Sequence, residues 1–127
     1  MKFYRLKVRD GLLFTQAALK RQQLVRVVKL LIDTGSTYTI LSWEALLSLG
    51  LDPASSLTRR HVTSANGLIV APEVEIDEFY SLGQRIEHFP VLAHTIPLGS
   101  QVSGVLGMNF LRRFDTNLNF KQATIRL

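Results

Sequence analysis

Apolar residues along this chain fall into short runs that turn signals separate. Valine, isoleucine, leucine, threonine and phenylalanine dominate the runs, and glycine, proline, asparagine and aspartate recur between them. Short runs of this kind, bounded by turn residues, are typical of strands joined by hairpins. The pattern predicts a mainly β domain with strands at residues 2–9, 12–19, 24–32, 57–64, 68–79, 85–93, 114–120 and 123–127.

Two segments are predicted to be helical. Ser42 can cap a helix over residues 43–49, which Gly50 ends. A shorter helix is predicted over residues 108–113. No internal repeat or linker interrupts the pattern, so residues 1–127 are expected to form a single domain.

Asn66-Gly67 is the strongest hairpin signal in the sequence. It separates the runs at residues 60–63 and 68–70. Both central residues of a type I′ turn need a positive φ, which asparagine and glycine adopt at low cost. A protruding β-hairpin with its tip near residues 65–68 is therefore expected.

Composition and charge narrow the classes of function. The formal charge is +5, but lysine and arginine occur in separated pairs without the interleaved aromatics that stack bases, so no nucleic-acid partner is expected. Cysteine is absent, which fits an intracellular setting. The charged start contains no signal-peptide core and no later run is long enough to span a bilayer. We therefore expect a cytoplasmic protein without a membrane partner.

Histidines offer one alternative chemistry. His61, His88 and His94 have a spacing that fits no helical zinc motif such as H-E-x-x-H. Neutral, hydrogen-bonded histidines are favoured, and no metal or other cofactor is expected.

The candidate catalytic residues are Asp33, Thr34, Gly35 and Ser36. The apolar run at residues 27–32 leads directly into them, so a buried strand can carry the carboxylate into a sharp turn. Gly35 permits a tight backbone, and the hydroxyls of Thr34 and Ser36 can orient the carboxyl. The alternative interpretation is an ordinary turn in which Asp33 caps its own loop.

Residues 30–36 resemble the active-site motif of the aspartic proteases, and the chain length favours their single-domain branch, the retropepsins. Residues 63–67 resemble the flap hairpin of bacterial members, and residues 104–111 resemble the apolar-apolar-glycine element beneath the catalytic loop. The resemblance implies an all-β, retropepsin-like closed barrel of short strands. It also implies a flap hairpin, one or two short helices, and activity as a two-fold homodimer.

Aspartic protease chemistry needs two carboxyls about 3 Å apart that share one proton. The internal rival for the second carboxyl is Asp115, but Asn117 stands where glycine is needed, and residues 112–114 are not a buried apolar approach. The resemblance therefore implies an aspartic endopeptidase whose second Asp33 comes from an identical subunit. Its substrate would be an extended peptide or protein, hydrolysed by general acid–base catalysis on water.

The resemblance also assigns roles to the neighbouring residues. Thr34 would bond the opposite subunit's loop, Gly35 would present its backbone to the substrate, and Ser36 would donate a hydrogen bond to Asp33. The hairpin residues that would close over the peptide are Ala65, Asn66, Gly67 and Leu68. The residues that would line apolar subsites are Leu31, Ile40, Val102 and Val105.

Two positions depart from the retroviral pattern. Thr37 and Met108 stand where the viral enzymes place an acid and an arginine that pair near the dimer contact, so that pair is absent. Residues 123–127 alternate apolar and polar, which suits either an interface strand or an ordinary sheet edge. The alternative function is a non-catalytic dimerisation or peptide-binding module on the same fold.

Overall fold

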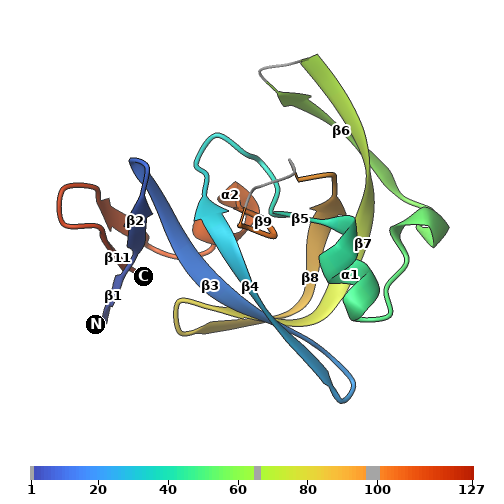
Figure 1. Ribbon diagram of the computed structural model, residues 1–127, viewed down its shortest axis with the longest axis horizontal. Helices are drawn as coiled ribbons and strands as arrows, with labels where there is room; N and C mark the ends of the chain where they lie inside the picture. Colours follow the sequence, from blue (N-terminus) through green and yellow to red (C-terminus); the bar gives the residue numbers. More distant parts are fainter. Residues whose placement is uncertain (1, 65–66, 97–100) are drawn as a thin grey trace.

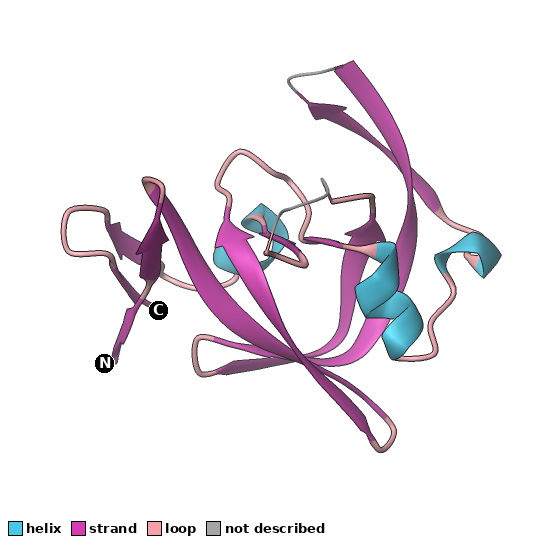
Figure 2. Ribbon diagram, viewed as in Figure 1, coloured by secondary structure: helices cyan, strands magenta, loops and turns pink. Residues whose placement is uncertain are grey.

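The computed structural model describes residues 2–64, 67–96 and 101–127, and most of these residues lie in strands (Figure 1, Figure 2). Two short helices and one 3-10 turn complete the described elements: α1 (Trp43–Ser48), α2 (Met108–Leu111) and η1 (Pro53–Ser55). The strands are β1 (Phe3–Arg5), β2 (Lys7–Arg9), β3 (Leu12–Arg21), β4 (Leu24–Ile32), β5 (Ile40–Leu41), β6 (Arg59–Ser64), β7 (Gly67–Ser81), β8 (Gln84–Ala93), β9 (Gly104–Leu106), β10 (Asn117–Asn119) and β11 (Thr124–Arg126). The prediction of a mainly β chain is confirmed.

The larger sheet closes into a barrel. Its strand order is β2-β3-β4-β9-β5-β8-β7-β6, and β3 also pairs antiparallel with β7 through Leu19 and Phe79. This second pairing joins the two ends of the inner sheet, which removes the exposed edges that β3 and β7 would otherwise have. The closed barrel expected from the resemblance is confirmed, with β2 and β6 as flanking strands.

Alternate side chains of the barrel strands fill one core. On β4, Val28 and Leu30 are buried, whereas Lys29 and Leu31 lie half-buried on the opposite face. The ring of Phe110 on α2 lies 5.7 Å from that of Phe79 on β7 and contacts the same core. Aromatic packing therefore fixes α2 against the barrel.

A separate three-stranded antiparallel sheet has the order β1-β11-β10. Ile125 at the centre of β11 is fully buried and pairs with Tyr4 on one side and Leu118 on the other. The segment 123–127 therefore contributes a central strand whose two edges are both paired within its own chain.

The remaining differences from the predicted elements concern where short strands and helices begin and end. Residues 2–9 form two strands because Leu6 is buried between them and its N–H donates to the Ala123 carbonyl, at 2.8 Å. The short strands β5 and β9 were not predicted, since two or three residues are too few to show alternation. The predicted strand at 114–120 shortens to β10, and the predicted helix at 108–113 shortens to α2.

The helix predicted at 43–49 is confirmed as α1, because the Ser42 hydroxyl oxygen caps it by accepting from the Ala45 N–H, at 3.2 Å. None of the helices in the described ranges is long and apolar enough to cross a bilayer.

Candidate active site

Asp33 lies directly after β4, where the chain leaves the barrel. Its N–H donates to the Leu106 carbonyl of β9, at 3.0 Å, just beyond the parallel pair of Ile32 and Leu106. The backbone of Asp33 is thus held by two neighbouring strands, while its side chain is half-buried.

A tight turn orients the Asp33 carboxylate. One carboxylate oxygen accepts a hydrogen bond from the Gly35 N–H, at 2.9 Å, and the Ser36 N–H donates to the Asp33 carbonyl, at 3.3 Å. A Cβ atom at residue 35 would lie 3.3 Å from that carboxylate oxygen, so glycine allows the close approach. The self-capping turn that the sequence left open is present. The same bond fixes the direction in which the carboxylate points.

The hydroxyls beside Asp33 behave differently from each other. Ser36 Oγ donates to the Tyr38 carbonyl, at 2.6 Å. A hydroxyl has one proton, so Ser36 does not donate to Asp33, in contrast to the bond that the resemblance implied. The Tyr38 carbonyl accepts this proton instead, because it lies two residues further along the chain, within reach of a local bond from side chain to backbone. Thr34 is exposed, and its expected bond to a second subunit stays a prediction.

The segment around Gly107 supports the loop from beneath. The N–H groups of Met108 and Asn109 donate to the carbonyls of Ser36 and Thr37, at 2.8 and 3.0 Å. A Cβ atom at Gly107 would lie 2.2 Å from the Tyr38 carbonyl oxygen, which no side chain tolerates. This packing is the one that the resemblance of residues 104–111 implied.

A polar pair that the sequence analysis did not identify fixes the far end of the loop. Thr39 is fully buried, and its N–H and its hydroxyl each donate to Asn109 Oδ1, both at 2.8 Å. Asn109 Nδ2 donates to the Pro90 carbonyl on β8, at 2.8 Å, and the Gly107 N–H donates to Thr39 Oγ1, at 3.1 Å. The loop, α2 and β8 are thereby joined. The only signal in the sequence was a polar residue within the apolar stretch 104–111.

Three residues predicted to line apolar subsites lie side by side. Val105 is in register with Leu31 on β4 and with Ile40 on β5. All three side chains are half-buried and face away from the core, because each has a fully buried leucine as a neighbour along its strand. Leu31 lies two residues before Asp33, so this apolar row lies beside the end of β4 that leads into Asp33.

The hairpin of β6 and β7 extends beyond the barrel, on the same upper side of Figure 1 as the loop after β4. Gly67 and Leu68 begin β7 and are exposed, whereas Ala65 and Asn66 lie outside the described residues. A hydrogen bond from Arg60 to Glu73 raises the pKa of Arg60, and electrostatic interaction with Tyr38 adds to this shift. The bond between Arg60 and Glu73, at 3.1 Å, joins β6 to β7 at the base of the hairpin.

The other candidate groups do not converge on Asp33. Asp115 is exposed, and its carbonyl accepts from Asn117 Nδ2 within a surface turn. His88 pairs with Glu75 at an exposed site, with 2.9 Å between Nδ1 and Oε1. Across residues 2–64, 67–96 and 101–127, no three histidine, aspartate or glutamate side chains gather as a metal site. Val102 lines a separate cavity, beside β4.

Comparisons with known proteins agree with this geometry. Residues 22–110, most of the chain, match the family model described as aspartyl protease. The structure is similar to the crystal structure of a retropepsin-like aspartic protease from Rickettsia conorii, with a TM-score of 0.73 and 21% sequence identity over 100% of this chain and 99% of that chain. No match was found among curated proteins. From the matched family model and the shared architecture, the chain belongs to the aspartyl protease family and has the retropepsin-like fold.

Proposed function

We propose that the chain is an aspartic endopeptidase, active as a homodimer in which each subunit contributes one Asp33 to a catalytic dyad. The observation that carries this proposal is the setting of Asp33. It is half-buried, its carboxylate is oriented by the Gly35 amide, and its loop is supported by α2. The apolar row of Leu31, Ile40 and Val105, which lies beside the end of β4, also supports the proposal.

The need for a second subunit follows from the chemistry. A single carboxyl cannot act as base toward water and as acid toward the substrate carbonyl in the same step. Within the described residues, no hydrogen bond or ion pair links Asp33 to another acid. Thr34 and Gly35 are exposed beside it, which leaves this loop accessible to an identical loop.

In the proposed mechanism, one Asp33 is ionised and removes a proton from a water molecule held between the two carboxyls. The other Asp33 is protonated and donates to the scissile carbonyl oxygen, so a tetrahedral intermediate forms without a covalent enzyme adduct. Two carboxyls this close share one proton, and their titration belongs to the pair. We therefore expect activity on the acid side of neutrality.

The surrounding residues would hold an extended peptide. Leu31, Ile40 and Val105 would accept hydrophobic side chains that flank the scissile bond. Gly67 and Leu68, with Ala65 and Asn66, would close over the peptide and add strand-like backbone hydrogen bonds. Thr34 would bond the partner's loop and keep the two carboxyls coplanar.

The Asp33→Asn variant tests this proposal. We expect at least about a 100-fold loss of cleavage of a denatured protein between about pH 3 and 7, because the amide cannot exchange the proton that acid–base catalysis requires. A pepstatin-type inhibitor should block the wild type. Mass in solution should show a dimer for both proteins.

The matched control is Asp115→Asn, which removes an exposed carboxyl and should retain full cleavage. Circular dichroism checks that both variants fold. If the folded wild-type dimer cleaves nothing over this pH range, the chain is instead a non-catalytic dimerisation or peptide-binding module.

A further inference from the structure

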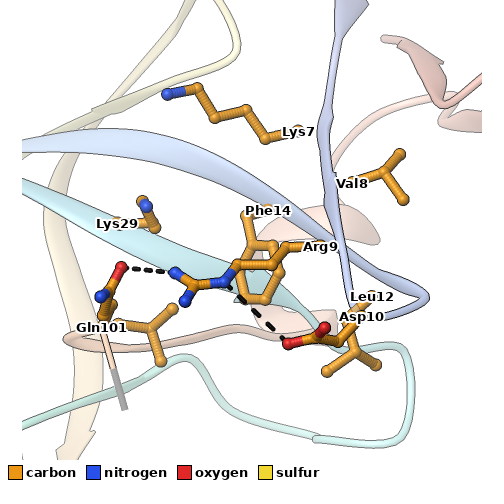
Figure 3. Close-up of a pocket in the computed structure, with 9 residues that line it drawn as sticks. Lys7, Val8, Arg9, Asp10, Leu12, Phe14, Lys29 and Gln101 are labelled. Carbon is orange, nitrogen blue, oxygen red and sulfur yellow. Dashed lines mark hydrogen bonds and ion pairs between the residues drawn. The ribbon is translucent and has the colours of Figure 1, made fainter. Parts of the chain in front are cut away.

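A cavity of about 350 Å³ lies on the outer side of the barrel, between the β2–β3 turn, β4 and the segment before β9 (Figure 3). Its charged and polar lining consists of Lys7, Arg9, Asp10, Lys29 and Gln101. The proposed catalytic chemistry uses none of these residues.

The lining of this cavity is strongly cationic. Three cations, Lys7, Arg9 and Lys29, line it together with a single acid, Asp10. Figure 3 shows the Arg9 guanidinium between Gln101, to which it donates a hydrogen bond, and Asp10, which lies 4.0 Å away. In the described ranges, neither Lys7 nor Lys29 forms an ion pair.

An adjoining cavity extends the positive surface. It has a volume of about 450 Å³, shares Lys7, Phe14 and Lys29 with the first, and adds Arg5 without adding an acid. Phe14 supplies an apolar wall to both cavities, and Val102 supplies one to the first. Low-dielectric walls concentrate the field of nearby charges, so an anion is favoured here more than at an open surface.

The cavity continues the apolar row away from Asp33. Lys29 and Leu31 alternate along β4 and therefore face the same side, and Asp33 follows at the end of the strand. Phe14 is in register with Leu31, and the Ser103 N–H donates to the Lys29 carbonyl, at 2.9 Å, which ties the Val102 segment to β4. Lys29 precedes Asp33 by four residues, or about 13 Å at roughly 3.3 Å per residue.

We propose that this cavity is a specificity subsite for an acidic side chain of the peptide substrate, an aspartate or glutamate three or four residues from the scissile bond. The inference rests on the proposed protease function. An extended peptide covers about 13 Å in about four residues, so its side chain would reach Lys29 while the scissile bond lies at Asp33. In a two-fold dimer the subsite occurs twice, so acidic residues are favoured on either side of the bond.

The test compares matched peptides that carry glutamate or glutamine at one position and hydrophobic residues at the scissile bond. At the third or fourth position we expect kcat/KM to be about three- to fivefold higher for glutamate, the range for a partly exposed ion pair. The Lys29→Gln variant should lose this ratio, and Lys29→Glu should favour a lysine peptide instead. Lys121→Gln removes the same charge from an exposed turn outside the cavity and should keep the wild-type ratio.

Two further conditions sharpen the test. The glutamate preference should fade in about 1 M salt, which screens the pair, and below about pH 4, where the peptide glutamate becomes protonated. A glutamate-to-glutamine ratio near one at every position would overturn the subsite while the protease proposal stands. A ratio that survives in Lys29→Gln, or that also disappears in Lys121→Gln, would overturn it too. If no peptide is cleaved, the proposed function fails and the subsite fails with it.

Discussion

Asp33 accepts a hydrogen bond from the Gly35 amide two residues away, and this bond limits the rotamers of the carboxylate in a single chain. A carboxylate that is already oriented loses little further freedom when a second carboxyl, a water molecule and a peptide assemble around it. The local bond to the Asp33 carboxylate and the more distant contacts of Gly107 and Asn109 with the loop therefore have the same effect. Both restrict the position of the carboxylate. The residues that provide this support carry out no chemistry themselves.

Asn109 connects the loop after Asp33 to β8 through its side-chain amide. Asn109→Ala would leave the Thr39 N–H and the Pro90 carbonyl without their hydrogen-bond partner in a part-buried site. We expect the free energy of unfolding to fall by about 2 to 4 kcal/mol, because each unsatisfied buried group costs about 1 to 3 kcal/mol. Urea unfolding followed by circular dichroism measures the change.

The matched control for this prediction is Asn117→Ala. Asn117 is exposed and its side chain makes a long bond of 3.3 Å to the Asp115 carbonyl, so its loss should cost less than about 0.5 kcal/mol. Equal effects of the two substitutions would mean that the Thr39–Asn109 pair does not stabilise the loop.

Some contacts of the Asp33 loop could be predicted from the sequence and others could not. Asp33 and Gly35 could be predicted together because they lie two residues apart and directly follow an apolar run. The hydrogen bond of Ser36 could not be predicted, since Asp33 and the Tyr38 carbonyl both lie within three residues of it and only the turn geometry decides between them. Thr39 and Asn109 are separated by 70 residues, so no local pattern pairs them.

Among the elements, β4 was predicted with the bounds that the structure has, since it is a nine-residue apolar segment between clear turn signals. β5 and β9 were missed, although they place Ile40 and Val105 beside Leu31. Their pairing is set by the closure of the barrel, which is a long-range property. The subsite residues could be named from the resemblance, but their common row required the fold.

The hairpin of β6 and β7 offers a test at this scale. Leu68 is 65% exposed, so Leu68→Ala should change the free energy of unfolding by less than about 0.5 kcal/mol. If the hairpin closes over the substrate, KM should rise about fivefold, from roughly 1 kcal/mol of lost apolar contact. Steady-state kinetics on a peptide substrate measure this change.

Leu57→Ala provides the comparison for the hairpin, since Leu57 is fully exposed in the connection before β6. Its removal should alter neither KM nor stability. A KM that is unchanged in Leu68→Ala would argue that the hairpin serves only as structure.

The seam of the barrel carries a pH-sensitive cluster. Hydrogen bonds from Arg85 and then Tyr80 lower the pKa of Glu78, and nearby Lys20 adds to the shift. A lowered pKa in the folded state means that the cluster stabilises the fold above the unfolded pKa of about 4.3, and that this contribution is lost as the pH falls through the folded pKa. The barrel should therefore lose stability at the acid end of the expected working range.

Glu78→Gln should flatten the fall in unfolding free energy between about pH 5 and 3. Asp77→Asn serves as the control, because Asp77 is exposed on the same strand and forms no ion pair within the described ranges. Urea unfolding at several pH values compares the slopes. A slope in Glu78→Gln equal to that of the wild type would assign the acid sensitivity to other groups.

At the scale of the whole molecule, the three-stranded sheet limits how two copies of the chain could pair. β11 is paired on both edges by β1 and β10 of its own chain, so residues 123–127 cannot pair with a partner strand unless one of these pairings breaks. The core and both sheets are complete in one chain. Only the proposed active site needs a second copy, which favours a dimer of folded subunits that can separate.

A mixing experiment tests whether each chain folds by itself while the active site needs two chains. Folded Asp33→Asn chains should pair with wild-type chains, because the substitution leaves the rest of the subunit intact. When equal amounts are mixed and allowed to exchange, about half of the wild-type chains pair with a variant, so their activity should fall to about half. Dilution of the wild type should lower its specific activity, since monomers lack a second carboxyl. A chain that holds a complete site by itself would instead keep its full activity in the mixture and on dilution, and the shared dyad would be excluded.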